Sequence, residues 1–454
     1  MFDEKIDEYK DEILNTLSDL IKYPSVSEES DNPEAPFGEN CNNVLNAFLN
    51  KAASLGFRTK NVDNYCGYVE FGDGPELVGI VGHLDVVPAL EEDGWTTPPF
   101  EPSIRDGKLY GRGSIDDKGP VVASLYAMKT IMDTTNVNKR VRLFVGLNEE
   151  KGWKCINHYK EVEEWPSIGF SPDANFPAIY AEKGIMSLSL KRPFKLNDVE
   201  IVSTDCKQNA INVVPKYASI TLRFTGEPRE LEDTDKVKVI SLSSQTIKLE
   251  SHGTASHASH PELGDNAIKN LVEYLLINFS HPDTYLFDLI NKGFFDIYSP
   301  VILSDSKIED ESGMLSSNVA DMSYENGFLT FKTNLRVPVT YSLDDIYGRY
   351  FKFKDLYPDL EIEKFGIQEP LYVEKDSYLV KTLVDIFNKK TGSNEEPIAI
   401  GGGTYARAFK NFVSYGANFP GDQDMCHQVD EFVYIDKLIT SAKIYAEAIY
   451  ELSK

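Results

Sequence analysis

The stretch ELVGIVGHLD, residues 76–85, decides the fold. Its apolar run predicts a buried strand, and the polar residues His83 and Asp85 follow at the end of that run. The segments around it alternate in type: we expect strands at 67–72 (GYVEFG) and 139–150 (KRVRLFVGLNEE), and a helix at 119–134 (GPVVASLYAMKTIMDT). Alternation of strands with a helix predicts an α/β domain whose sheet is mostly parallel.

The chain is long enough for more than one domain, because it has 454 residues. From about residue 184 the α/β pattern is replaced by short β-like runs around one predicted helix, 266–279. Near residue 372 the helical pattern returns. We therefore expect a catalytic domain in two parts, 1–183 and 373–454. The segment between them, 184–372, is expected to be an inserted α+β domain that could consist of two smaller units.

Charge and cysteine content exclude several classes of protein. The net charge is -26, from 46 basic and 72 acidic residues, so no basic footprint for nucleic acid or an anionic membrane is expected. The five cysteines are scattered and form no CxxC motif, which is typical of a reducing compartment. The acidic N-terminus does not resemble a signal peptide, and no stretch is long and apolar enough for a membrane span. The expected location is cytoplasmic.

Acids and histidines recur where the predicted strands end. In an open α/β sheet, functional sites lie at the carboxyl ends of the strands. The residues in such positions, or in a glycine-rich turn before a helix or near the C-terminus, are His83, Asp85, Asp116, Glu149, Glu150, Asp173 and His427. Singly, each acid could be a helix cap, a turn residue or part of a solvated surface. Their recurrence at successive strand ends favours a site.

This set of side chains suits divalent metal ions. Asp, Glu and His without ordered cysteines are ligands for Zn²⁺, Mn²⁺ or Co²⁺. Two ions that share a carboxylate need about five protein ligands, plus one more carboxylate as general base. Adjacent residues of an extended strand end point to different sides, so one of Glu149 and Glu150 could bind metal while the other faces the attacking water. Periodicity alone does not say which.

Five segments, in this order, resemble the co-catalytic zinc metallopeptidases of the aminoacylase and carboxypeptidase G type: GHLDVVP, GRGSIDDKG, NEEKG, SPDANFP and FPGDQDMCHQVDE. The length and the long insertion resemble the dipeptidase V branch of that family. The resemblance implies a phosphorylase/hydrolase-like catalytic domain interrupted by a lid domain, here 184–372. Asp173 stands where carboxypeptidase-like relatives have Glu, which points away from carboxypeptidase G itself.

The resemblance also implies roles for the strand-end residues. His83 and Asp173 would bind one metal, Glu150 and His427 the other, and Asp116 would bridge the two. Asp85 would orient the imidazole of His83 by a hydrogen bond. Glu149 would be the general base, and the peptide bond Asp116–Asp117 would be cis. The implied cofactor is a pair of divalent ions, Zn²⁺ in the first place, with Mn²⁺ or Co²⁺ as alternatives.

In the lid, the resemblance implies that His257 (GTASHASHPELGDNAI) stabilises the oxyanion of the transition state. Asn212 (NAINVVPKY) matches a lid motif, and Arg336 (TNLRVP) matches an arginine that grips the substrate carboxylate. The turn AIGGGTYARAF lacks the P-loop pattern. Its residues Gly402, Gly403 and Thr404 are candidates for substrate binding through backbone N–H groups at a helix N-terminus, with a plain tight turn as the alternative.

The expected function is a metal-dependent dipeptidase that hydrolyses short unblocked peptides through a metal-bridged water. The alternative within enzymes is an N-acyl-amino-acid amidohydrolase, a deacylase or desuccinylase, that uses the same site. A binding protein without catalysis is a third possibility, and a glycosidase would leave His83 and His427 without a task. The expected partner is a dipeptide or short peptide, with no nucleic acid and no membrane. We expect a monomer, because a doubled lid could supply His257 within one chain; a dimer is the alternative.

Overall fold

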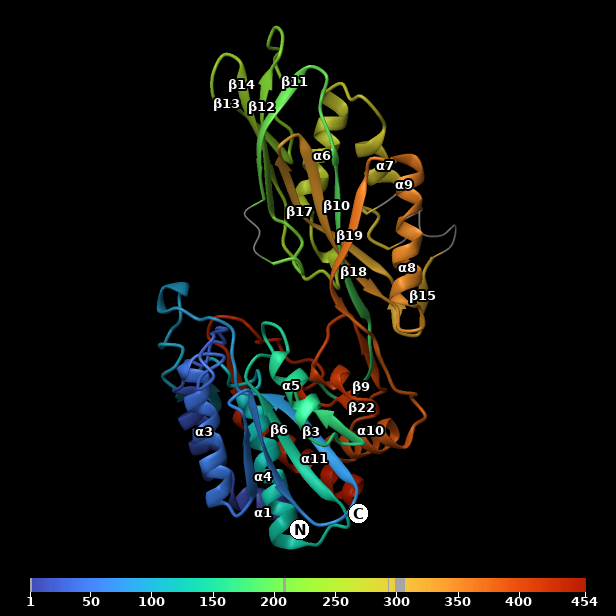
Figure 1. The fold of residues 1–454 in the computed structure, drawn as a ribbon. Coiled ribbons are helices and arrows are strands. Elements are labelled where there is room, and N and C mark those ends of the chain that lie inside the picture. The colour runs from blue at the N-terminus through green and yellow to red at the C-terminus, as the bar shows by residue number, and fades with distance from the viewer. Residues whose placement is uncertain (1, 207–209, 293, 299–306) are drawn as a thin grey trace. The chain divides into compact units, whose positions relative to one another are not determined.

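The computed structural model describes residues 2–206, 210–292, 294–298 and 307–454, and the chain divides into two compact units (Figure 1). Unit 1 comprises Met1–Tyr180, Val373–Ile398 and Gly403–Lys454. Unit 2 comprises Ala181–Tyr372 and the short segment Ala399–Gly402. The chain therefore leaves unit 1 twice, once for a long insertion and once for four residues.

Unit 1 is built on the large sheet that the sequence predicts. Its first strands, in spatial order, are β1 (Arg58–Val62), β2 (Cys66–Phe71), β6 (Arg140–Gly146), β3 (Leu77–His83), β7 (Ile168–Ser171), β22 (Phe412–Ser414) and β9 (Ile179–Glu182). Strand β3 runs parallel to both β6 and β7, and β22 runs parallel to β7. Towards β1 the pairing is antiparallel. The buried centre of the sheet is thus parallel, as the strand–helix–strand pattern predicted.

Helices cover both faces of this sheet. The helices of unit 1 are α1 (Phe2–Glu8), α2 (Lys10–Ile21), α3 (Glu39–Ser54), α4 (Lys118–Thr134), α5 (Lys154–Val162), α10 (Tyr378–Thr391) and α11 (Ile435–Ser453). A side chain at Gly67 would meet α3, and one at Gly82 would meet α4. Both glycines pair with Val145 of β6, and residues paired across neighbouring strands point to the same face of a sheet. Helices α3 and α4 therefore lie on that face, and α11 packs beside α4. A side chain at Gly146 would instead meet Cys155 of α5 on the other face.

Short strands complete unit 1. β4 (Ser103–Arg105), β5 (Lys108–Tyr110) and β24 (Phe432–Tyr434) form a three-stranded sheet, and β8 (Ala174–Asn175) pairs with β23 (Ala417–Asn418). The 3₁₀ helices η1 (Glu91–Asp93) and η3 (Tyr405–Ala408) lie in loops. Strand β21 (Ile398–Ile400) pairs with β9 where the chain passes into unit 2.

Unit 2 is the α+β insertion that the short β-like runs predicted. One four-stranded sheet has the order β17 (Ser316–Glu325), β18 (Phe328–Val337), β10 (Gly184–Pro193) and β19 (Glu361–Gln368). The other has the order β11 (Val199–Asp205), β12 (Tyr217–Phe224), β14 (Thr246–His252) and β13 (Val237–Ser241). The remaining elements are β15 (Glu309–Asp310), β16 (Gly313–Met314), β20 (Leu371–Tyr372), η2 (Pro261–Leu263), α6 (Ala267–Asn278), α7 (Tyr285–Lys292), α8 (Leu343–Tyr350) and α9 (Lys352–Leu356).

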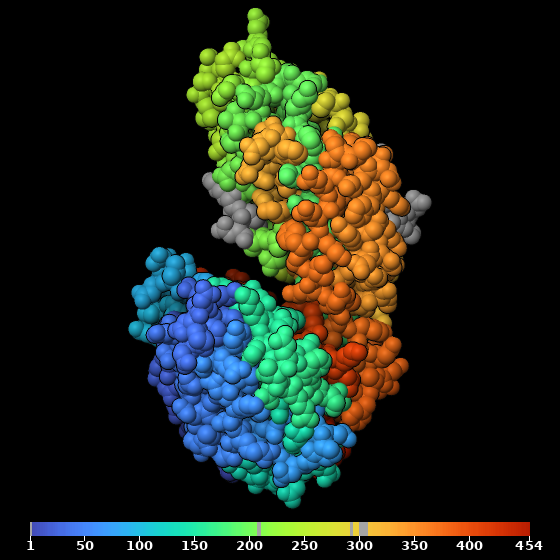
Figure 2. Space-filling model, in the orientation of Figure 1, coloured from blue at the N-terminus to red at the C-terminus, as the bar shows by residue number. Residues whose placement is uncertain are grey.

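Both sheets of unit 2 contribute to one hydrophobic core. Leu188 of β10 and Phe331 of β18 belong to the same buried cluster as Leu222 of β12 and Leu271 of α6. In Figure 2 the orange atoms of α8, α9 and β19 form one continuous surface of this unit. Among the described helices of the whole chain, none is long and apolar enough to cross a membrane.

Candidate functional site

The strand-end residues of unit 1 come together at one edge of the sheet. His83 is the last residue of β3, Asp173 lies two residues after β7, and Glu149 and Glu150 lie in a turn after β6. Because β6, β3 and β7 are neighbours and run in the same direction, their carboxyl ends meet. The apolar runs that place these strands in the core therefore also place their polar ends side by side.

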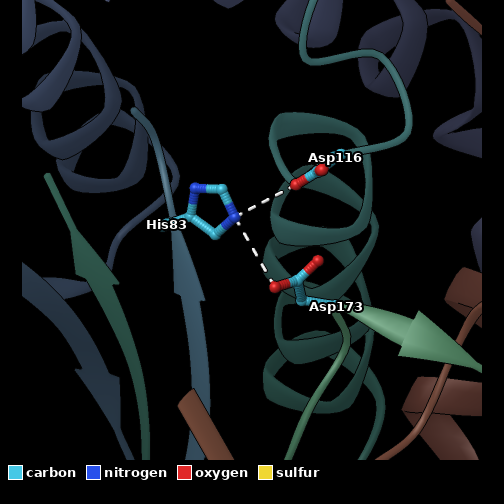
Figure 3. Close-up of side chains that lie close together, drawn as sticks. All are labelled: His83, Asp116 and Asp173. Atoms are coloured by element: carbon cyan, nitrogen blue, oxygen red, sulfur yellow. Dashed lines mark ion pairs between the residues drawn. The ribbon is translucent and has the colours of Figure 1, made fainter. Parts of the chain in front are cut away.

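Five side chains form two groups that share Asp116. His83, Asp116 and Asp173 form one group, and Asp116, Glu150 and His427 form the other. In each group the potential ligand atoms all lie within 4.8 Å of one another. Figure 3 shows Nε2 of His83 facing the carboxylates of Asp116, at 3.2 Å, and Asp173, at 3.6 Å. These are the five residues that the resemblance nominated as ligands.

The two oxygens of Asp116 face different histidines. Oδ1 lies 3.2 Å from Nε2 of His83, whereas Oδ2 lies 3.0 Å from Nε2 of His427. His427 Nε2 also lies 3.2 Å from Oε1 of Glu150. A carboxylate placed between two such nitrogens can serve two cations at once.

Asp85 lies next to His83, but it orients the imidazole by a different atom from the one expected. Nδ1 of His83 lies 2.9 Å from the backbone oxygen of Asp85, whereas the nearest carboxylate oxygen is 3.5 Å away. The carboxylate instead accepts the backbone N–H groups of Glu149 at 3.1 Å and Glu150 at 3.2 Å.

The position of the glutamate pair corrects a sequence-based expectation. Strand β6 ends at Gly146, so Glu149 and Glu150 are not adjacent residues of an extended strand end. They lie in a turn, and the alternation of side chains along a strand does not apply there. The turn separates their roles in another way: Oε1 of Glu150 faces His427, whereas Oε1 of Glu149 accepts a hydrogen bond from the indole N–H of Trp153 at 3.3 Å.

Glu431 holds the turn that carries Asp116. Its fully buried carboxylate accepts the backbone N–H groups of Gly113, Ile115 and Asp116 at 3.0 to 3.3 Å. It also accepts a 2.7 Å hydrogen bond from the guanidinium of Arg112. The peptide bond Asp116–Asp117 in this turn is cis, which confirms the expectation from the resemblance.

The next two residues of the motif anchor the turn from its other side. Oδ2 of Asp117 accepts a hydrogen bond from the backbone N–H of His83 at 3.0 Å. Only glycine at position 82 makes room for this carboxylate, because a Cβ there would lie 2.4 Å from Oδ2. Nζ of Lys118 donates to the backbone oxygens of Leu20 at 3.0 Å and Tyr23 at 2.9 Å. Burial lowers the pKa of Lys118 to about 7.

Both histidines of the two groups have raised pKa values. Burial lowers the pKa of His83, but the carboxylates of Asp116, Asp173 and Asp85 outweigh it, and the pKa lies well above its ordinary value. At His427 the same opposition of burial and carboxylates raises the pKa to about 11. Without cations, the acids of the site therefore keep protons on the rings.

The four carboxylates of the site differ in pKa: one has a lowered pKa and stays ionised, whereas the other three have raised pKa values, which disfavour their ionised form. Burial raises the pKa of Asp116, but the two histidines that face its carboxylate lower it well below its ordinary value. Burial, with the charge of neighbouring acids, raises the pKa of Glu149 strongly, that of Glu150 to about 7, and that of Asp173. Ionising all four acids together would need positive charge beside them.

The donor set fits divalent metal ions. Nε2 of His83 is buried, and among the described residues it has no hydrogen-bond partner despite the two carboxylates that face it. Nitrogen and oxygen donors without thiolates are the ligands that Zn²⁺, Mn²⁺ and Co²⁺ accept. Unit 1 thus contains two candidate metal sites with one common carboxylate.

In unit 2, Asn212 and His257 lie on adjacent segments. The backbone oxygen of Asn212 accepts the N–H of Ala258 at 2.8 Å, and Val213 forms an antiparallel bridge with His257. Arg336 is almost fully buried. Its Nε donates to Oδ1 of Asn334 at 2.9 Å.

The glycine-rich turn is divided between the units. Gly402 belongs to unit 2, whereas Gly403 and Thr404 belong to unit 1. A four-residue 3₁₀ helix, η3, follows in place of the expected helix, and Oγ1 of Thr404 accepts the N–H of Ala406 at 3.1 Å. A helix this short gives little macrodipole for an anion. The proposed substrate contact of this turn therefore depends on its backbone groups alone.

Sequence reasoning missed the residues that support the site. Arg112, Asp117, Lys118 and Glu431 all lie inside the motif segments GRGSIDDKG and FPGDQDMCHQVDE, but none received a role. The available signal was the presence of charges in segments that also carry metal-ligand candidates. The contact between Arg112 and Glu431 joins residues 319 positions apart, which no local pattern encodes.

Comparisons with known protein sequences find matches over most of the chain. The family model described as peptidase family M20/M25/M40 matches residues 79–451. The protein named "Putative dipeptidase YtjP" of Bacillus subtilis (strain 168) is 36% identical over 468 residues, covering 98% of each chain.

Solved structures share the fold. Human carnosine dipeptidase 1 matches with a TM-score of 0.62 and 16% identity, over 100% of this chain and 98% of that one. The di-peptidase Dug1p from Saccharomyces cerevisiae matches with a TM-score of 0.60 and 14% identity, again over 100% and 98%.

Proposed function

Because the chain belongs to peptidase family M20/M25/M40, we propose that it is a metal-dependent dipeptidase that hydrolyses short unblocked peptides. The observation that carries the proposal is the pair of ligand groups that share Asp116. Beside them lies Glu149, a carboxylate that belongs to neither group.

We propose His83, Asp116 and Asp173 as the ligands of one ion, and Asp116, Glu150 and His427 as those of the other. Zn²⁺ is the first candidate, with Mn²⁺ or Co²⁺ as alternatives. When bound, such ions act as Lewis acids and make water a nucleophile at neutral pH. They would also supply the positive charge that the four acids of the site need.

Glu149 is the proposed general base. Its carboxylate accepts a proton from the attacking water and returns that proton to the leaving amine. Cations beside it favour the ionised form that a base requires, because they oppose the burial that raises its pKa. The indole N–H of Trp153 holds one oxygen of Glu149 and so fixes the direction of the other. Asp85 fixes the backbone from which Glu149 extends.

The inserted segment 184–372 is proposed to act as a lid. Within it, His257 is proposed to donate a hydrogen bond to the oxyanion of the transition state. Asn212 and Arg336, with Gly402, Gly403 and Thr404, are proposed to bind the substrate. The buried guanidinium of Arg336 would attract a peptide carboxylate.

A dipeptide is the proposed substrate because of the named relatives. The protein from Bacillus subtilis carries a dipeptidase name and aligns with this chain over nearly its whole length. We also propose that the chain belongs to the dipeptidase V branch, on the strength of its length and its long insertion. An N-acyl-amino-acid amidohydrolase would use the same ions and the same base, so the free amine of the substrate decides between the two. We further propose that the protein acts as a monomer in the cytoplasm.

A substrate panel with controlled metal content tests the proposal. The purified protein is stripped with a chelator, reloaded with Zn²⁺, Mn²⁺ or Co²⁺, and assayed against matched pairs such as Ala-Leu and N-acetyl-Ala-Leu. The expected result is metal-restored cleavage of the free dipeptide and little cleavage of its acylated form. Preference for N-acyl amino acids would replace the dipeptidase by the amidohydrolase, and absence of any metal-restored hydrolysis would refute both.

A further inference from the structure

Within its own loop, the imidazole of His257 is bonded to Ser259. Nδ1 of His257 lies 2.6 Å from Oγ of Ser259. The backbone N–H of Ser259 donates to the same nitrogen at 3.3 Å.

The backbone donor decides which nitrogen carries the proton. A backbone N–H can only donate, so Nδ1 must act as an acceptor. A neutral imidazole has one accepting nitrogen and one N–H, and the proton of His257 therefore lies on Nε2. The hydroxyl of Ser259, at 2.6 Å from an accepting nitrogen, is then a second donor to Nδ1. Two donors at one nitrogen also disfavour the protonated ring, which would carry hydrogens on both nitrogens.

The chain around this pair is fixed on both sides. The N–H of Ala258 donates to Asn212, and the N–H of Val214 donates to Ser256, both at 2.8 Å. These bonds hold the backbone that precedes and follows His257. The ring therefore has little freedom except rotation of its own side chain, which Ser259 restricts.

The glycine-rich turn holds Ser259 itself. A Cβ at Gly401 would lie 2.6 Å from Cβ of Ser259, so only glycine lets the two segments approach this closely. The backbone oxygen of Gly401 accepts a 2.8 Å hydrogen bond from Nη1 of Arg336. A chain of contacts within unit 2 thus runs from the buried guanidinium through the turn to the serine.

We propose that Ser259 is a positioning residue that holds His257 as the neutral Nε2–H tautomer, ready to donate a hydrogen bond to an oxyanion. The catalytic purpose of this arrangement rests on the proposed function, in which His257 stabilises the transition state. The tautomer itself does not, because it follows from the hydrogen bonds of the loop. Arg336 donates to the backbone oxygen of Gly401, and Gly401 packs against Ser259, so these two residues help to fix the position of the serine.

A purely structural role of Ser259 is the alternative, since side chains that bond to the backbone two residues away also stabilise turns. Ser256 provides the matched control. It lies in the same loop, and its Oγ donates to the backbone oxygen of His260 at 3.1 Å. A variant that only loosens the loop should therefore behave alike at both serines.

The test combines ¹⁵N spectroscopy of the histidine rings with steady-state kinetics on the full-length metal-loaded protein. The signal of His257 is identified by its loss in His257→Gln, and spectra are recorded at pH 8.5. The expected result is a pyridine-type Nδ1 and a pyrrole-type Nε2. Ser259→Ala removes the hydroxyl donor to Nδ1 but keeps the backbone N–H of residue 259, so the Nδ1–H tautomer should gain population without becoming the only form. In Ser259→Ala, kcat should fall by about 3- to 10-fold. This loss is smaller than the roughly 100-fold or greater loss expected when an oxyanion donor is removed, because His257 itself remains.

Two further readouts separate positioning from folding. KM should change less than twofold in Ser259→Ala, and Ser259→Thr should restore both the tautomer and kcat, because it returns the hydroxyl. Ser256→Ala should leave both unchanged. An Nδ1–H signal in the wild-type protein would overturn the proposal, as would equal behaviour of Ser259→Ala and Ser256→Ala. If no peptide is cleaved at all, the proposed function fails, whereas the ring spectra still decide the tautomer.

Discussion

The backbone N–H of Glu149 donates to the carboxylate of Asp85 at 3.1 Å. The other oxygen of the same carboxylate accepts the N–H of Glu150 at 3.2 Å. One side chain thus fixes the backbone of both glutamates, the one proposed to bind metal and the one proposed to move the proton. Asp85 therefore acts on the turn after β6 as well as on its neighbour His83.

Asp85→Asn should lower activity without releasing His83. The substitution replaces one accepting oxygen by an NH₂ group, which cannot accept from a backbone N–H, so one glutamate loses its restraint. His83 keeps its contact, because that contact uses the backbone oxygen of residue 85. We expect kcat to fall by about 10-fold or more, with near-normal binding of the ion at His83. Kinetics and metal analysis by mass spectrometry check this, and loss of both ions would contradict it.

Glu149 and Glu150 should respond differently to the same substitution. Glu149→Gln removes the proposed general base, so kcat should fall by about 10² to 10⁴-fold while two ions per chain remain. Glu150→Gln removes a ligand, so the second ion should bind much more weakly. The two variants serve as controls for each other in a paired measurement of kcat and metal content. If Glu149→Gln loses metal and Glu150→Gln keeps it, the two roles are exchanged.

Glu431→Ala should strongly destabilise the metal-free protein. The substitution leaves the buried guanidinium of Arg112 without its carboxylate and three backbone N–H groups without an acceptor. Breaking a buried ion pair from one side costs about 3–5 kcal/mol in the free energy of unfolding. Urea unfolding followed by circular dichroism measures the loss.

The matched control for Glu431 is an exposed pair of the same chemistry. Glu200 lies 3.2 Å from Arg223, and both side chains are more than half exposed. Glu200→Ala should cost no more than about 1 kcal/mol, because solvent screens exposed ion pairs. A similar urea midpoint for the two variants would show that Glu431 does not hold the turn of Asp116.

Metal binding should release protons and weaken as the pH falls. In the metal-free protein the acids around His427 raise its pKa to about 11, so at pH 7 the ring carries a proton that an ion must displace. Below that pKa, each unit of pH should weaken the apparent affinity by about tenfold for every proton displaced. Calorimetry at pH 7 in buffers of different ionisation enthalpy counts the protons. An affinity that is constant between pH 6.5 and 8.5 would contradict the prediction.

The sequence predicted the parts of the fold and the site that depend on local pattern. Apolar runs predicted the strands β3 and β6, and the parallel pairing of β3 with β6 and β7 brings His83, Asp173 and the glutamate pair to one edge. Asp116 and His427 were candidates from their own segments, and the resemblance supplied the two groups in which the structure places the ligand candidates. These predictions succeeded because an apolar run of consecutive residues indicates a buried strand, and the alternation of strands with helices indicates parallel pairing.

The remainder depends on contacts that consecutive residues do not encode. The position of Glu149 and Glu150 in a turn, three residues or more beyond the end of β6, was missed because the strand boundary was placed too late. The contact of Asp85 with two N–H groups depends on the course of that turn. Glu431 acts on a turn more than 300 residues earlier in the chain, and only the folded structure shows the pairing.

The four-residue segment Ala399–Gly402, which belongs to unit 2, limits how this protein can be divided into separate fragments. Cutting at the two ends of the long insertion would yield a continuous fragment, 181–372, that lacks this segment. The backbone oxygen that receives Arg336 and the one that receives the N–H of Lys183 both belong to it. The segment 181–372, transplanted alone into another scaffold, would carry the buried guanidinium of Arg336 without that acceptor. Moving unit 2 of this protein into another scaffold must therefore transfer two pieces of chain, one of them only four residues long.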